Sequence, residues 1–154
     1  FSSSSVTRAP PERYVMVSLE QPVGPLVFLN IYAPNQAQDA FLRQTLQECL
    51  ATTDDNLVVG RDFNLVWDPN LDRNTTHFQG TGAISHLLHK EIGEAGLVDA
   101  WIHLHPDSGD YTCYSAVHCS YSRIDFIFLS HSLLSGLASA ISQIFPFLIT
   151  PTLS

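Results

Sequence analysis

The chain has 154 residues, of which 45% are hydrophobic and 14% are charged. This composition excludes an intrinsically disordered protein and is typical of one globular domain, or of part of one. The formal net charge of −8 argues against a broad basic face that binds nucleic acid without sequence preference. It does not exclude a nuclease, because bound metal ions supply positive charge locally at such a site.

Cysteine content and apolar runs indicate the cellular setting. Three cysteines, Cys49, Cys113 and Cys119, are too few for a disulfide framework, so we expect a reducing, intracellular compartment. The first residues lack the basic and apolar regions of a signal peptide. The longest apolar runs fall far short of the ~20 residues that a membrane span requires, so no membrane association is expected.

Taken in chain order, the hydrophobic pattern predicts alternating strands and helices. Residues 1–12 are rich in Ser and Pro and are expected to be a loop or disordered. The next elements are predicted as a strand at 14–19, a strand buried on both faces at 26–32, a helix at 39–52, a strand at 56–60, a polar loop through 82, and a helix at 84–95 with Ile84, Leu87, Leu88 and Ile92 on its inner face.

The last third of the chain predicts a hairpin and short helical pieces. Gly96 is placed to end the preceding helix, and Asp99 to cap a helical turn that carries Trp101. Strands are expected at 111–114, 122–129 and 138–148, with a short helix capped by Ser132 before the last of them. No linker or repeat marks a second domain, so residues 13–154 are predicted to form an α/β (α+β) two-sheet sandwich flanked by helices.

Two short motifs set polar side chains beside strand-like runs. Asp62 and Asn64 follow the apolar run 57–59 and are two residues apart, so an extended backbone points both to one side. Arg123 and Asp125 likewise share one face of their run. Carboxylates and amides at strand ends suit metal-assisted phosphate chemistry. Spacing alone leaves open that these residues form only a turn and a surface pair.

Several motifs occur in a characteristic order: Asn30-Ile31-Tyr32-Ala33-Pro34-Asn35, Asp62-Phe63-Asn64, Leu71-Asp72-Arg73, Leu97-Val98-Asp99-Ala100-Trp101, Tyr111-Thr112, Ser115-Ala116-Val117-His118 and Ser122-Arg123-Ile124-Asp125. In this order they resemble the endonuclease/exonuclease/phosphatase superfamily, and within it the endonuclease domain of LINE-type retrotransposon polyproteins that also carry reverse transcriptase. The resemblance covers residues 13–154. It implies a DNase-like sandwich that hydrolyses DNA phosphodiesters with Mg²⁺ or Mn²⁺.

The resemblance also implies roles for individual residues. Tyr32 would lie beside the scissile phosphate, although without the resemblance it would be interpreted as a buried strand tyrosine. Asp62 and Asn64 would handle the attacking water and the phosphate, Asp62 would lie near the metal, and Asp125 would hold a catalytic histidine. The residues expected to contact the substrate are Asn35, Arg73, Thr112, Ser122 and Arg123.

The chain departs from the family pattern at three places. The family's metal-binding Asn and Glu have no counterpart upstream of Tyr14, and its closing Ser-Asp-His motif would continue after Ser154. We therefore expect a domain truncated at both ends, with impaired activity and with 26–32 as an unpaired, aggregation-prone edge strand. Arg61 replaces a family glycine, a residue that permits unusual dihedral angles; an arginine there would crowd the phosphate or pair with Asp62.

The sequence leaves more than one function open. The favoured one is a metal-dependent endonuclease domain within a longer polyprotein, acting in the nucleus if its target is genomic DNA. The alternatives are a non-catalytic remnant of a mobile element, and a phosphatase or phosphodiesterase that acts on a small phosphate ester. A zinc site is not expected, because the spacing of Cys113 and Cys119 does not match structural zinc motifs.

Overall fold

The computed structural model describes residues 4–8, 13–22, 24–51, 56–74, 84–106 and 110–134, with side chains from residue 13 onward. Its elements, in chain order, are β1 (Ser4–Arg8), β2 (Tyr14–Leu19), β3 (Leu26–Tyr32), α1 (Gln38–Leu50), β4 (Leu57–Asp62), α2 (His86–Glu94), β5 (Leu97–Asp99), α3 (Ala100–Leu104), β6 (Cys113–Ser115), β7 (Ser120–Ser122), β8 (Asp125–Ser130) and the 3-10 helix η1 (His131–Leu133).

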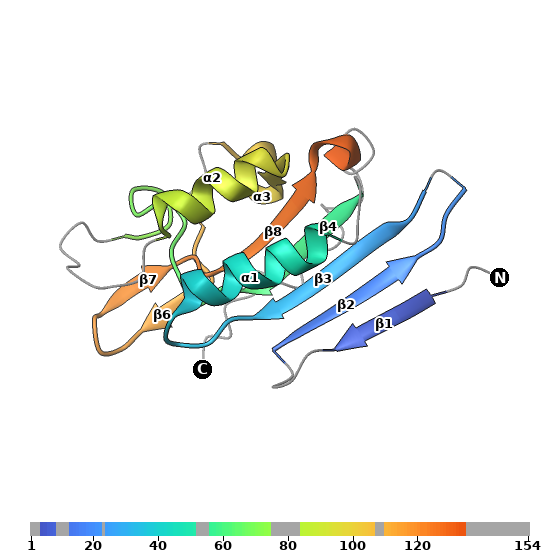
Figure 1. Ribbon diagram of the computed structural model, residues 1–154. Coiled ribbons are helices and arrows are strands. Elements are labelled where there is room, and N and C mark those ends of the chain that lie inside the picture. Colours follow the sequence, from blue (N-terminus) through green and yellow to red (C-terminus); the bar gives the residue numbers. More distant parts are fainter. Residues whose placement is uncertain are drawn as a thin grey trace.

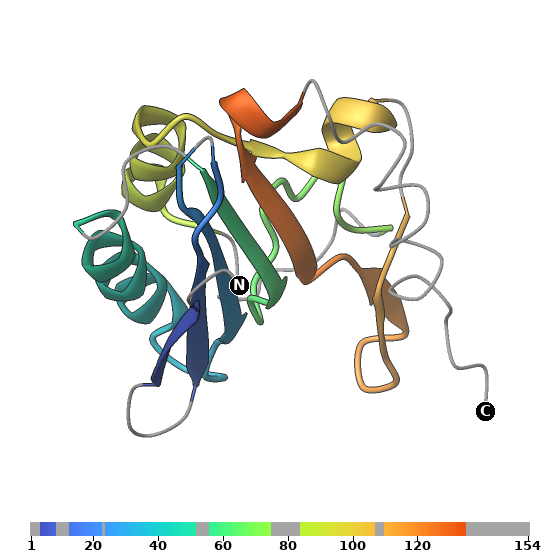
Figure 2. The same cartoon turned by 90° about the vertical axis from the view of Figure 1, so that its right-hand side faces the viewer.

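One mixed sheet of six strands forms the centre of the molecule, in the order β1-β2-β3-β4-β8-β5. β3 and β4 run parallel, and the other neighbouring pairs run antiparallel. β6 and β7 form a separate two-stranded hairpin. Helices α1 and α2 cover one face of the large sheet, and α3 and the hairpin lie toward its other side (Figure 1, Figure 2). This arrangement confirms the predicted DNase-like α/β fold class.

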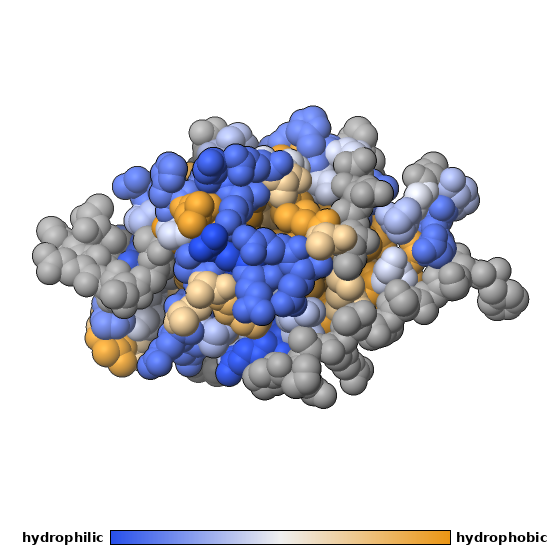
Figure 3. Space-filling model, viewed as in Figure 1, coloured by the Kyte–Doolittle hydropathy of each residue, from blue (hydrophilic) through white to orange (hydrophobic). Residues whose placement is uncertain are grey.

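The main core lies between the large sheet and helices α1 and α2. Val27, Leu29 and Ile31 of β3 are buried against this helical layer. Phe28 and Tyr32 alternate with them and are 38% and 47% exposed. The prediction that this strand is buried on both faces is therefore wrong, because only one face of β3 is covered by helices. The outer surface of the helices is largely hydrophilic (Figure 3).

The ends of α2 follow from local sequence signals. Ser85 caps its N-terminus by accepting a hydrogen bond from the N–H of Leu88 at 3.1 Å. Gly96 follows the helix with a φ of 64°, a conformation that costs glycine little. Leu88 and Ile92 face the core, but Leu87 is 45% exposed, which corrects the predicted inner face. Leu88 and Ile92 are four residues apart, and Leu87 is turned away from that stripe.

The first residues differ from the prediction, because residues 4–8 form strand β1 rather than a loop. The backbone of β1 pairs with β2 in an antiparallel ladder, with Val6 opposite Val17. Ladder hydrogen bonds need no apolar pattern, so a Ser-rich segment can supply them. β3 is paired on both sides, by β2 and β4, and is not the unpaired edge that the sequence predicted.

Residues 111–134 also depart from the prediction. The strand expected at 122–129 divides into β7 and β8, because the N–H of Arg123 donates to the carbonyl of Asp72 instead of continuing a ladder. Ser132 lies within η1, and its hydroxyl donates to Asn56 Oδ1 at 3.2 Å; the helix that the sequence predicts after Ser132 extends beyond the described residues. The strand predicted at 138–148 lies outside the described residues. In the part of the chain that is described, no helix has the length and apolar character needed to cross a bilayer.

Candidate active site

Three adjacent strands bring together polar side chains from distant parts of the chain. Tyr32, the last residue of β3, is opposite Asp62 at the end of β4. Asp62 is in turn opposite Asp125, the first residue of β8. Residues that face each other across an antiparallel pair have Cβ atoms about 4.5–5.5 Å apart. The carboxylates of Asp62 and Asp125 therefore lie close together.

The two carboxyl groups influence each other electrostatically. Burial raises the pKa of Asp62 above its ordinary value, and the negative charge of Asp125 raises it further. The N–H of Asn64 donates to Asp62 Oδ1 at 2.8 Å, which acts in the opposite direction, as does the charge of Arg61. Asp62 therefore retains a proton more readily than an exposed carboxyl group. Such a group is suited to proton transfer.

Asn64 is fixed beside Asp62 by two loops. Its φ is 51°, a left-handed conformation that asparagine tolerates better than most residues. Its side-chain Nδ2 donates to the carbonyl of Ala33 at 2.7 Å. The side chain of Gln38 donates to the carbonyls of both Asn35 and Asn64, at 2.9 and 3.2 Å. The loops that follow β3 and β4 are thus joined, and Asn35 itself is exposed at this end of the sheet.

Thr112 and Ser122 frame the other side of the pair. Thr112 Oγ1 accepts hydrogen bonds from the N–H groups of Ile124 and Asp125, at 3.1 and 3.2 Å. The N–H of Thr112 donates to the carbonyl of Ser122 at 3.0 Å, and Arg73 forms an isolated β-bridge with Ser122. The side chain of Arg73 is half-buried, and this burial lowers its pKa. These residues therefore lie around Asp125, and Thr112 holds its backbone directly.

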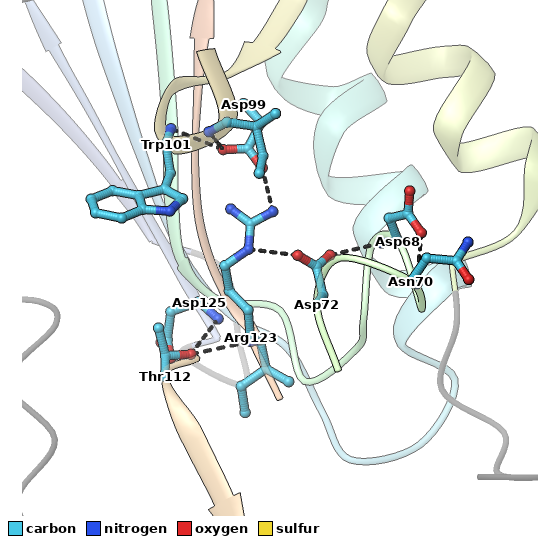
Figure 4. A network of polar contacts seen from close by, with 10 residues as sticks. Asp68, Asn70, Asp72, Asp99, Trp101, Thr112, Arg123 and Asp125 are labelled. Atoms are coloured by element: carbon cyan, nitrogen blue, oxygen red, sulfur yellow. Dashed lines mark hydrogen bonds and ion pairs between the residues drawn. The ribbon is translucent and has the colours of Figure 1, made fainter. Parts of the chain in front are cut away.

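Arg123 lies beside Asp125 as expected, but its side chain is buried and paired. It is only 4% exposed, and its guanidinium forms ion pairs with Asp72 and Asp99 instead of facing solvent. Its Cζ also lies 4.6 Å from the centre of the Phe126 ring. The sequence carried no signal for this burial, since the two carboxylates come from separate segments. Figure 4 shows the three charged side chains together with Thr112 and Asp125.

A cavity of about 300 Å³ opens on the side of the large sheet away from α1 and α2. Its walls include Asp125, Thr112 and part of Arg123, together with residues that sequence reasoning did not assign to the site: Phe28, Asn30, Trp101 and Asp110. Cys113 lies nearby, and the pKa of its thiol is raised by burial and by the charges of Asp125 and Asp62. Most of the wall is hydrocarbon, and Asp125 is one of its few polar lining residues.

The described residues do not complete a metal site. No group of three or more His, Cys, Asp and Glu side chains in them is arranged to hold an ion. Asp62 and Asp125 form a facing pair of carboxylates, which favours a bound cation because it reduces their mutual repulsion. Mg²⁺ is commonly bound by one or two carboxylates, and water and substrate oxygens supply its other ligands. The pair therefore fits part of such a site.

Comparisons with known proteins agree with the fold. No protein-family model matches the chain. The endonuclease domain of TRAS1, a telomere-specific non-LTR retrotransposon, superposes with a TM-score of 0.58 at 16% identity, covering 86% of this chain and 58% of that domain. The chain has the endonuclease/exonuclease/phosphatase fold. D. rerio TDP2, solved with a single-strand DNA product, superposes with a TM-score of 0.53 at 18% identity, covering 83% of this chain and 52% of that chain.

A search by sequence finds similarity to a transposon protein. The chain is 30% identical over 149 residues to the transposon TX1 uncharacterized 149 kDa protein of Xenopus laevis. This alignment covers 93% of the chain and 11% of the TX1 protein. The chain is thus similar to a small part of a large transposon protein, and it spans little more than half of the structures that it resembles.

Proposed function

We propose that the chain forms part of a retrotransposon-type endonuclease domain that hydrolyses DNA phosphodiesters. The observation that carries this proposal is the pairing of Asp62 with Asp125 across β4 and β8, with Tyr32 on the adjacent strand and Asn64 beside them. These residues occupy one end of a fold that it shares with a retrotransposon endonuclease domain. The similarity to a transposon protein supports a longer polyprotein as the parent, and such a parent would act in the nucleus on genomic DNA.

Each residue has a role that its surroundings support. Asp62, with its raised pKa, orients the attacking water and accepts its proton. Asn64 offers a neutral amide to the phosphate, and the half-exposed hydroxyl of Tyr32 lies at the same end of the sheet. Asp125 would accept a hydrogen bond from the catalytic histidine of the parent domain and so position it. A bound Mg²⁺ or Mn²⁺ would polarise the phosphoryl oxygens, with Asp62 as its ligand in this chain.

The substrate contacts follow the same arrangement. Thr112 holds the backbone of Asp125, Ser122 pairs with Thr112, Arg73 pairs with Ser122, and Asn35 follows the end of β3. We propose that these four residues contact the DNA backbone on either side of the scissile bond. The charge of −8 on the chain means that only a few cations can serve this purpose. Arg73 is the cation that lies beside Ser122, and Arg13 lies 5.6 Å from the centre of the Tyr32 ring.

The test is a nicking assay on supercoiled plasmid with Mg²⁺ or Mn²⁺. It compares this chain with a longer parent domain, because the chain alone is expected to show little activity. In the parent, Asp62→Ala is expected to lower the rate by about 10²–10⁴-fold, the contribution of a general base. The matched control is Glu94→Gln, which removes an exposed carboxylate of α2 and should leave the rate unchanged.

Each result separates the possible functions. A parent domain that keeps full nicking activity after Asp62→Ala would contradict the proposal. A parent without any nicking activity would favour a non-catalytic remnant. Hydrolysis of a small phosphomonoester such as p-nitrophenyl phosphate, without nicking, would favour a phosphatase of the same fold.

A further inference from the structure

A buried arginine links three segments next to the proposed active site. The Nε of Arg123 donates to Asp72 Oδ1 at 2.7 Å, and its Nη2 lies 2.8 Å from Asp99 Oδ2. All three side chains are almost fully buried, with exposed fractions of 5%, 1% and 10% for Arg123, Asp72 and Asp99. Figure 4 shows that the guanidinium lies between the two carboxylates. A charged group at this depth is tolerated only because it is paired.

The two carboxylates are themselves fixed to the backbone. Asp72 Oδ2 accepts a hydrogen bond from the N–H of Asp68 at 2.7 Å, in the loop that follows β4. Asp99 Oδ1 caps α3 by accepting from the N–H groups of Trp101 and Ile102, at 3.0 and 3.3 Å. Arg123 therefore connects the loop after β4 and the start of α3 to its own segment, which leads into β8.

The backbone around Arg123 is fixed on both sides. Its own N–H donates to the carbonyl of Asp72 at 2.9 Å. The next two N–H groups, of Ile124 and Asp125, share Thr112 Oγ1, and the carbonyl of Ile124 accepts from the N–H of Phe63 at 2.9 Å. Residue 125 is where β8 begins and where the carboxylate comes opposite Asp62.

We propose that Arg123 is a positioning residue: by clamping Asp72 and Asp99 it holds the segment 123–125 so that Asp125 faces Asp62. In this role Arg123 supports the pair of carboxylates, Asp62 and Asp125, and does not contact the substrate. Whether Arg123 matters for hydrolysis depends on the proposed function. Whether it positions Asp125 does not.

Charge and geometry both argue against a phosphate contact. One arginine with two aspartates carries a net charge of −1, so the group as a whole repels a phosphate. The forked guanidinium is also the side chain that can bridge two carboxylates from different segments, because its donors are fixed in one plane. A lysine ammonium is a single point of charge and cannot reproduce this arrangement.

The first test measures amide hydrogen exchange by NMR in this chain, so it needs no substrate. The variants are Arg123→Lys and Arg123→Met, with Arg123→Met/Asp72→Asn as a variant that leaves less uncompensated charge if the single change prevents folding. The control is Arg43→Met, which breaks an arginine–carboxylate pair with Glu91 between α1 and α2. In every Arg123 variant the amides of Ile124 and Asp125 are expected to lose at least tenfold in protection relative to the β3 and β4 amides.

A second readout reports the distance between Asp125 and its neighbours. In a Cys119→Ser background, the pH profile of Cys113 alkylation by iodoacetamide senses the charge of Asp125. Asp125→Asn should shift this profile to lower pH when Arg123 is present. In the Arg123→Met background the same change should shift it less, because Asp125 has moved away. A variant that is less stable but still folded keeps this coupling, because Asp125 then remains beside Cys113.

Two outcomes would overturn the proposal. One is uniform loss of protection across β3, β4 and residues 124–125. The other is an Asp125→Asn shift of equal size with and without Arg123. Neither outcome bears on whether the parent domain cuts DNA, so failure here is distinguishable from failure of the nicking assay.

Discussion

Replacing Arg61 with glycine should stabilise the fold. Arg61 lies within β4, opposite Ile31 on β3 and Phe126 on β8. Its φ is 102°, in a region that residues with a Cβ seldom adopt. Such a conformation costs roughly 1–3 kcal/mol when the surrounding structure imposes it. The two ladders on either side of β4 impose it here, so the strain is stored in the folded state.

The expected gain is smaller than the strain itself. With glycine at position 61 the unfolded chain is more flexible, and this costs the folded state about 0.5–1 kcal/mol of stability. The difference leaves Arg61→Gly about 1 kcal/mol more stable than the parent chain. Loss of the arginine charge should also raise the pKa of Asp62, since that charge lowers it.

The measurement is urea unfolding of three proteins: the chain itself, Arg61→Gly and Arg61→Ala. Alanine removes the same side-chain atoms beyond Cβ but keeps the strained conformation, so it isolates the backbone effect. With m-values of about 1–3 kcal/mol/M, the glycine variant should have a midpoint higher than the alanine variant by roughly 0.3–1 M. If Arg61→Gly unfolds at the same urea concentration as Arg61→Ala, the backbone at residue 61 is not strained and the reasoning fails.

Two further predictions concern the carboxylate pair. Thr112→Val keeps the shape of the side chain but removes the acceptor shared by the N–H groups of Ile124 and Asp125. The free energy of unfolding, measured in urea, should fall by about 1–3 kcal/mol. A change near zero would mean that water replaces the hydroxyl. Asp125→Asn should lower the pKa of Asp62 toward its ordinary value, because one of the causes that raise it is removed; ¹³C NMR titration of the Asp62 carboxyl group measures this, and an unchanged midpoint would contradict the proposed contact. A raised carboxyl pKa makes stability fall as pH rises from the ordinary value through the folded one, so Asp125→Asn should also reduce that fall.

Local patterns in the sequence determined much of the fold. Short apolar runs located β3 and β4, and helical spacing located α1, because each signal depends on neighbours within a few residues. Asp99 was recognisable as a cap from its position before a helical turn, and the structure confirms it. The order of motifs indicated the superfamily whose fold the structure shows. The extended backbone that the sequence predicted from Asp62 to Asn64 is not present, because Asn64 has a φ of 51° in a turn after β4; its N–H donates to Asp62 Oδ1, so the two residues are still neighbours.

The tertiary structure decided what depends on contacts between distant segments. The sequence suggested that Asp62 and Asp125 meet only through a resemblance, whereas the pairing of β4 with β8 brings them opposite each other. The burial of Arg123 could not be predicted, because a buried charge requires partners, and Asp72 and Asp99 reach it only in the folded chain. Periodicity records which face of an element is apolar; it does not record which strands are neighbours, since that choice depends on the packing of the whole domain.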